Sequence, residues 1–367
     1  MLLKLSLTAH PMVDKENPMK YIAYIGSNAC GENSGLRVAE VNAETGSLSI
    51  IQRLADFDSA PYPAVSADRK NLVAGGSNPA APVPQRGMTA SFKIQPDGKL
   101  EPVNASVAVC QNPPCHVCFS PDKRFAYAAH YGEGRLTAYA IAEDASIWGP
   151  VQVLQHEGCG PFLPNQESAR VHYCTFTPDG KYLCAVDLGL DIIRVYRPDE
   201  NGQLSHVKDV PVVKGAGSRH MVFSHDGSLC YVVSELKCRL TTFAYNDGEF
   251  TRLETISTLI NPDTEDRHDS SAIRISADGR YLFAGNRHVN NVAVFKLDDG
   301  MPRLIANVPC AFPRDLNILP NDKFLYVCGQ DENVVEIFSF DSETGELKPT
   351  GERLELPLAT AIVFMEV

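Results

Sequence analysis

Ionisable side chains stand at the beginning or the end of several short apolar segments in this chain. Four of them are His172, Arg219, Glu235 and Arg287. A histidine or glutamate can act as the base that takes a proton from water, because burial and neighbours tune its pKa toward neutrality. An arginine presents a planar fork of N–H donors that holds an anion or stabilises an oxyanion. These residue types could bind a small anionic ester and promote attack of water on its carbonyl carbon.

Five further side chains at aligned positions are candidates for substrate binding: His220, Arg314, Asp315, Asp187 and His130. Charged and imidazole groups are costly to bury without partners, so several that converge from separate strands indicate a polar ligand-binding mouth. Two alternatives stay open for single residues. A polar residue at a strand end can be a solvated rim group, and Arg219 and Glu235 can form an ion pair that only bridges neighbouring strands.

The elements that must position these residues form a repeat of roughly 45–55 residues, which is the length of a β-propeller blade. Its first half is a strand, a turn and a second strand, as in TPDGKYLCAVD from Thr177 and SADGRYLFAGNR from Ser276. Asp, Asn, Gly and Pro supply the turn, and apolar runs that follow it predict buried strands. The second half is an alternating strand that ends in another turn, as in NVAVFKLDDGMPRL.

The two halves of the repeat occur in unequal numbers, seven copies of the second and six of the complete first. The segment Tyr21–Asn28 resembles the second strand of a first half without its opening strand, and Ala359–Val367 resembles that missing strand. Pairing the two would close a ring and remove the open sheet edges. We therefore predict an all-β fold, a seven-bladed β-propeller closed by its terminal strands, over residues 19–367. Residues 1–18 are expected to be a disordered tail.

The innermost strand of each blade lines the channel of a propeller, so equivalent positions on these strands face a shared pocket. Five residues before each Ser/Thr-Asp turn stand Pro61, Cys115, His172, Arg219, Ser271 and Arg314. One residue later stand Tyr62, His116, Tyr173, His220, Ala272 and Asp315. The ends of the second strands give another ring, which includes His130, Asp187, Glu235 and Arg287.

Composition limits the classes of partner. The formal net charge of −12 argues against nucleic-acid binding, and no stretch of about 18 apolar residues predicts a membrane helix. The 11 cysteines lack framework spacing and are interpreted as reduced core residues of a cytoplasmic protein. The expected assembly is a monomer or a weak homo-oligomer.

No cofactor or metal site is predicted. Cys115 and Cys118 form a C-x-x-C pattern, but residues three apart on a strand point to opposite faces and cannot share a metal. No Gly-x-Ser-x-Gly elbow indicates a serine hydrolase.

From about Met19 to Val367 the chain resembles the bacterial seven-bladed lactonase family, which includes propeller-type 6-phosphogluconolactonases and fungal carboxy-cis,cis-muconate cyclases. The motifs that carry the resemblance include GCGPFLPNQESARVHYCTFTPDGKYLCAVD, GAGSRHMVFSHDGSLCYVVSEL, SADGRYLFAGNRHVNNVAVF and PRDLNILPNDKFLYVCGQ. The active-site set that the resemblance implies falls on His172, Arg219, Glu235 and Arg287. The chain departs from the family pattern at Arg170, Ala272 and Arg274.

The resemblance implies a hydrolase that converts 6-phosphogluconolactone to 6-phosphogluconate in the pentose phosphate pathway, with a small anionic lactone as its partner. Two alternatives are an intramolecular lyase related to the muconate cyclases and a propeller that serves as an interaction scaffold. The repeats lack the Trp-Asp signature of many scaffolds, and the chain has one tryptophan. Which of His172 and Glu235 is the base, and which lactone is the substrate, stays open.

Overall fold

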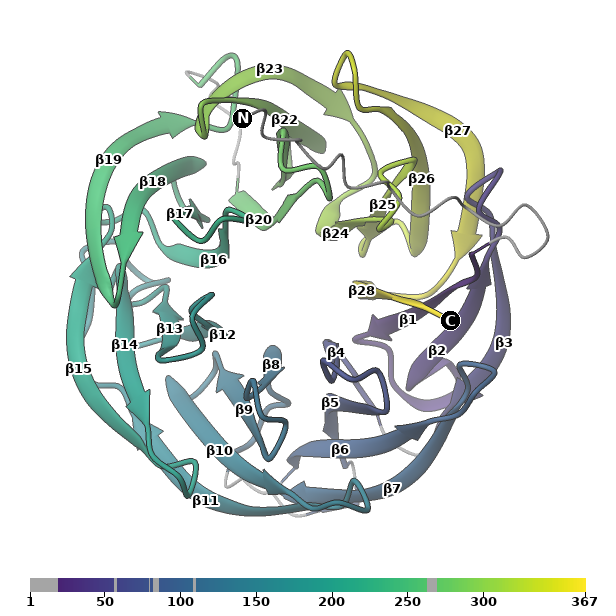
Figure 1. The fold of residues 1–367 in the computed structure, drawn as a ribbon, viewed down its shortest axis with the longest axis vertical. Coiled ribbons are helices and arrows are strands. Elements are labelled where there is room, and N and C mark those ends of the chain that lie inside the picture. Colours follow the sequence, from purple (N-terminus) through teal and green to yellow (C-terminus); the bar gives the residue numbers. More distant parts are fainter. Residues whose placement is uncertain (1–18, 56–57, 79, 82–85, 108–109, 263–268) are drawn as a thin grey trace, which may run out of the picture.

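A computed structural model describes residues 19–55, 58–78, 80–81, 86–107, 110–262 and 269–367. The predicted tail, residues 1–18, lies outside them. The described strands form seven antiparallel four-stranded sheets arranged as blades around a central axis (Figure 1). The seven-bladed propeller predicted from the repeats is therefore confirmed.

Each blade contributes strands in the same order from the axis outward. The innermost strands are β28 (Ala359–Glu366), β4 (Pro63–Val65), β8 (His116–Phe119), β12 (Val171–Phe176), β16 (Ser218–Phe223), β20 (Asp269–Ile275) and β24 (Pro313–Ile318). The second strands are β1 (Tyr21–Ser27), β5 (Asn71–Ser77), β9 (Phe125–His130), β13 (Leu183–Asp187), β17 (Leu229–Ser234), β21 (Tyr281–Arg287) and β25 (Phe324–Gly329). The third strands are β2 (Leu36–Val41), β6 (Gly87–Ile94), β10 (Arg135–Ile141), β14 (Ile192–Pro198), β18 (Arg239–Asn246), β22 (Asn291–Asp298) and β26 (Val334–Asp341). The outer strands are β3 (Leu48–Leu54), β7 (Leu100–Val107), β11 (Ile147–Gln155), β15 (Leu204–Pro211), β19 (Glu249–Ser257), β23 (Met301–Pro309) and β27 (Glu346–Glu355), and a short 3-10 helix, η1 (Gly31–Asn33), follows β1.

The ring closes where the first and the last strand pair. The C-terminal strand β28 pairs antiparallel with β1, from Tyr21 opposite Glu366 to Ser27 opposite Ala359 (Figure 1). The blade that contains β1 and β28 is thus built as the unequal repeat counts predict. Because β28 completes the first blade, every inner strand pairs along one edge with the second strand of its own blade.

A hydroxyl group fixes the turn after the inner strand in five of the blades. In five blades a Ser or Thr Oγ donates to an Asp Oδ1 two residues later, over 2.6–2.7 Å, and accepts the N–H of the fifth residue, over 2.9–3.1 Å. These residues are Ser66, Ser120, Thr177, Ser224 and Ser276. Such a side chain satisfies turn amides that have no ladder partner, which explains the repeated Ser/Thr-x-Asp signature.

The core lies between blades. Each of the seven apolar clusters is formed by residues of two adjacent blades. Tyrosines on second strands cross the same interfaces, because their hydroxyl groups donate to a glycine carbonyl in a hairpin of the next blade. The pairs are Tyr24 with Gly98 at 2.9 Å, Tyr127 with Gly202 at 3.0 Å, Tyr231 with Gly300 at 2.6 Å and Tyr326 with Gly46 at 2.7 Å. Interblade packing therefore holds the inner strands in fixed positions around the channel.

Candidate active site

A β-bulge stands near the start of several inner strands. The register of β12 with β13 shifts between Val171 and Tyr173, so His172 is the extra residue. The same shift makes Arg219 the extra residue of β16 and Arg314 the extra residue of β24. A bulge re-aims the side chain of its extra residue, and bulges are frequent next to active sites. This local irregularity turns the three side chains toward one pocket.

The pocket lies at one mouth of the channel and has a volume of about 670 Å³, within the roughly 300–1,000 Å³ of small-molecule sites. The residues that line it are Asn28, Ser59, Pro61, Asn112, Pro113, Cys115, Tyr131, Gly132, His172, Glu235 and Arg314. A smaller, deeper hollow shares five of these residues and adds Tyr62, Arg219, His220, Asp315 and Thr360. Most of the inner-strand residues that occupy equivalent positions of the repeat therefore line one or both hollows.

Glu235 connects Arg219, which lines the deeper hollow, with Arg287, which lines neither hollow. Its Oε2 lies 2.8 Å from Nε of Arg219 and 2.8 Å from Nη2 of Arg287. Arg219, Glu235 and Arg287 are 2%, 8% and 6% exposed, so all three charges are largely withdrawn from water. Burial alone would raise the pKa of Glu235, but Arg287, Arg219 and Arg314 together lower it. Glu235 is therefore a carboxylate that holds both guanidinium groups in place.

Arg314 differs from these two arginines. Its side chain lines both hollows, yet within the described part of the chain its guanidinium makes no hydrogen bond or ion pair. Burial lowers the pKa of Arg314, and the nearby charge of Arg287 lowers it further. An anion in the pocket would relieve this repulsion, since guanidinium groups pair well with anionic oxygens.

His172 carries no charge in this environment. Burial, followed by the charges of Arg219 and Arg314, lowers its pKa well below 6.5. Its ring lies edge-on to Tyr131 and to His220, with centroids 5.4 and 5.2 Å apart. A neutral imidazole in a pocket that can admit water retains a lone pair that can accept a proton.

The floor of the site is a stack of rings. His116 lies between Tyr62 and Tyr173, with centroids at 4.2 and 3.9 Å, and Tyr173 contacts His220 at 4.6 Å. Nη2 of Arg274 lies 3.0 Å from Asp315 and 3.1 Å from the hydroxyl of Tyr62. The carboxylate of Asp315 is thus paired with Arg274.

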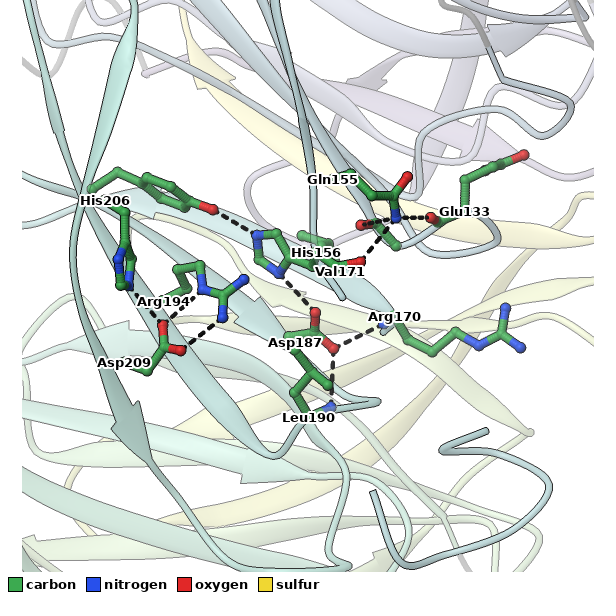
Figure 2. Close-up of polar contacts among 12 residues, drawn as sticks. Glu133, Gln155, His156, Arg170, Val171, Asp187, Leu190, Arg194, His206 and Asp209 are labelled. Carbon is green, nitrogen blue, oxygen red and sulfur yellow. Dashed lines mark hydrogen bonds and ion pairs between the residues drawn. The ribbon is translucent and has the colours of Figure 1, made fainter. Parts of the chain in front are cut away.

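The structure does not place Asp187 or His130 on the pocket. Both oxygens of Asp187 have partners outside the pocket: Oδ1 accepts the N–H groups of Arg170 and Leu190, and Oδ2 lies 2.8 Å from Nδ1 of His156, which follows the outer strand of the preceding blade (Figure 2). His130 lies 3.2 Å from the thiol of Cys110, and burial lowers its pKa to about 4. The prediction that these two residues bind substrate is corrected, because both are buried in the interior.

The prediction used the last residue of the second strand, whereas the residue that lines the pocket is the one that follows it. His130 is the last residue of β9, and its successor Tyr131 lines the pocket; Ser234 ends β17, and its successor Glu235 lines it. Because successive residues of a strand point to opposite sides, a shift of one residue moves a side chain from the pocket to the interior. The alignment of Tyr131 with Glu235 was the signal that could have identified Tyr131. Thr360 was missed because its bulge lies in β28, which is far in sequence from the other strands of its blade.

Fold and site together define a closed β-propeller with a small-molecule pocket at its channel mouth. The family model "Lactonase, 7-bladed beta-propeller" matches residues 22–364, and the chain belongs to this family of lactone-hydrolysing enzymes. The 6-phosphogluconolactonase of Bacillus subtilis is 29% identical over 94% of this chain and 99% of its own length. An uncharacterized protein of Staphylococcus epidermidis is 32% identical over 89% of this chain and 94% of its own.

Solved structures agree with this placement. A periplasmic gluconolactonase of Pseudomonas aeruginosa superposes with a TM-score of 0.87 at 26% identity, and the match covers 94% of this chain and 99% of the other. Because that protein is periplasmic, the cytoplasmic location expected for this chain stays a prediction. Among the described residues no helix is long and apolar enough to cross a membrane.

Proposed function

We propose that the protein hydrolyses a phosphorylated sugar lactone, 6-phosphogluconolactone, to 6-phosphogluconate. The observation that carries this proposal is Arg314, a guanidinium that lines the pocket and has no partner among the described residues. Arg219 and Arg287 share the single carboxylate of Glu235, so the three arginines have positive charge to spare. A phosphate group, with a charge of roughly −1.5 to −2, fits such a site better than a neutral sugar does.

Arg314 binds the phosphate in this proposal. Its planar fork can pair with two phosphate oxygens, and burial strengthens such a charge-assisted bond. The name of the Bacillus subtilis relative, a 6-phosphogluconolactonase, supports the choice of substrate.

His172 serves as the base, and Glu235 does not. The lowered pKa of His172 leaves it neutral, whereas Glu235 already accepts from two guanidinium groups. Water adds to the carbonyl carbon while His172 takes its proton. The oxyanion then collapses, the bond from the carbonyl carbon to the ring oxygen breaks, and that oxygen receives the proton from His172. The product acid releases a proton to solvent.

Arg219, which lines the deeper hollow, stabilises the oxyanion of this step, and Arg287 supports it through the carboxylate that both share, Glu235. Glu235 fixes their direction before the substrate binds, so little reorganisation is needed in the transition state. Removal of one such donor typically costs a factor of roughly 10²–10³ in kcat.

The test is hydrolysis of three lactones by purified protein, with spontaneous hydrolysis subtracted: 6-phosphogluconolactone, unphosphorylated gluconolactone and a carboxymuconate lactone. We expect the largest kcat/KM for the phosphorylated lactone. Equal values for the two gluconolactones would overturn the phosphate assignment. Turnover of the carboxymuconate lactone alone, or of none of the three, would overturn the proposed function.

A further inference from the structure

Carboxylates at the end of a second strand or in the turn beyond it bind backbone amides that lead into the bulges. Oδ1 of Asp187 accepts the N–H of Arg170 over 2.8 Å (Figure 2). The two oxygens of Asp191 accept the N–H groups of Gly215 and Gly217, each over 2.6 Å. Oε2 of Glu332 accepts the N–H of Phe312 over 2.9 Å. The bound amides precede the inner strands of three blades, whereas Asp187 and Asp191 belong to one blade and Glu332 to another.

The bound amides have a constant position relative to the pocket residues. Arg170, Gly217 and Phe312 each stand two residues before the extra residue of a bulge, and those extra residues are His172, Arg219 and Arg314. A bulge leaves local amides without a ladder partner, and a carboxylate oxygen is a strong acceptor for them. Each carboxylate therefore fixes the backbone just ahead of one functional side chain.

Asp187 is itself held rigidly. It is fully buried, and its Oδ2 lies 2.8 Å from Nδ1 of the equally buried His156, whose Nε2 lies 2.8 Å from the hydroxyl of Tyr196. Figure 2 shows this line of contacts from the tyrosine through His156 to Asp187 and the backbone of Arg170. A rigid acceptor of this kind can fix the position of β12 along the channel axis.

We infer that Asp187, Asp191 and Glu332 are positioning residues, which set His172, Arg219 and Arg314 respectively for the reaction through the backbone. This inference rests on the proposed function. Errors of about 1 Å in such positions can cost a factor of roughly 100 in rate. Because each carboxylate serves one pocket residue, its loss affects the step that residue performs.

The first experiment compares kcat and KM on 6-phosphogluconolactone for Asp187→Ala and Asp187→Asn. We expect Asp187→Ala to lower kcat about 10- to 100-fold with KM within about twofold of wild type, since only the base is displaced. Asp187→Asn restores most of kcat, because its amide oxygen still accepts the N–H of Arg170. An Asn variant as slow as the Ala variant, or a proportional change in kcat and KM, overturns the role of Asp187 as an acceptor that positions His172.

Glu332→Ala is the second variant, and it keeps the inference testable if Asp187→Ala does not fold, because Glu332 is exposed. We expect it to raise KM for the phosphorylated lactone about 5- to 10-fold and leave kcat unchanged, because Arg314 holds the phosphate. Titration calorimetry with 6-phosphogluconate, which needs no turnover, should show the same weakening. Unchanged KM and unchanged product affinity overturn the inference for Arg314.

Asp209→Asn is the matched control. Asp209 lies in the same blade as Asp187, but its carboxylate pairs with the side chain of Arg194, at 2.7 Å, on the outer part of the blade (Figure 2). We expect wild-type kcat and KM. A loss in this control equal to that in Asp187→Ala would show a general effect of blade charge and overturn the inference. A wild-type protein inactive on every lactone instead overturns the proposed function, which separates the two failures.

Discussion

At the scale of single residues, charge separates the roles of His172 and Glu235. The sequence left both as candidates for the base, because either residue type can be tuned toward neutrality. Burial and then the nearby arginines lower the pKa of His172, whereas burial would raise the pKa of Glu235 and the arginines lower it, so the two shifts have opposite chemical consequences. The histidine becomes a neutral acceptor, and the glutamate becomes a fixed counter-ion.

Substitution of the two residues should therefore change different quantities. We expect His172→Ala to lower kcat by a factor of roughly 10²–10⁴, the usual contribution of a general base. Glu235→Gln lowers kcat as well, since the arginines lose their common partner, but it retains the pH dependence due to His172. Steady-state kinetics from pH 5 to 8 check this. A His172→Ala enzyme with wild-type kcat would remove the assignment.

The pH profile itself follows from the direction of the shift. Activity needs neutral His172, and burial with nearby arginines lowers its pKa well below 6.5, so kcat/KM should stay on a plateau at pH 6.5 and decline only at lower pH. Arg314→Ala removes a positive neighbour and should move this acid limb to higher pH. Unphosphorylated lactone is the better substrate here, because phosphate titrates near pH 6. A wild-type midpoint at or above 6.5 would contradict the account.

At the scale of elements, the sequence predicted the strands and their order, because strand alternation and turn residues are local properties. It also predicted that Cys115, His172, Arg219 and Arg314 share a pocket, because these residues occupy one repeat position. Bulges and the carboxylates that support them depend on contacts between strands, so no local pattern indicated them. The one-residue offset that placed Asp187 and His130 inside the blade has the same origin.

The tyrosine contacts between blades make a prediction about stability. Tyr127→Phe removes a hydroxyl that donates to Gly202 of the next blade, so we expect a loss of roughly 1–3 kcal/mol in the free energy of unfolding. Tyr21→Phe is the control, because among the residues that the structure describes its hydroxyl contacts only the sulfur of Met19, at 3.8 Å. Urea unfolding of both variants measures the difference. Equal midpoints would show that the interblade bond contributes little.

At the scale of the whole molecule, the fold depends on closure of the ring. β28 supplies the innermost strand of the first blade, and its residues Ala361 and Ile362 are fully buried. Removal of residues 359–367 would expose the edge of β1 and a large apolar surface. We expect the shortened chain to be insoluble or to unfold at a much lower temperature, as measured by thermal denaturation.

Removal of Val367 alone serves as the control for this truncation, because half of its surface is exposed. It should leave the unfolding temperature nearly unchanged. A chain without residues 359–367 that unfolds cooperatively at the wild-type temperature would refute the role of closure.

The central claim is that the channel mouth selects a phosphorylated lactone through Arg314. The most direct measurement is the ratio of kcat/KM for 6-phosphogluconolactone to that for gluconolactone, in the wild type and in Arg314→Ala. We expect a ratio of about 100 or more in the wild type, since a buried charged pair contributes several kcal/mol. In the variant we expect at least a tenfold smaller ratio, mainly because KM for the phosphorylated lactone rises. The same ratio in both proteins, or a ratio near one in the wild type, would contradict it.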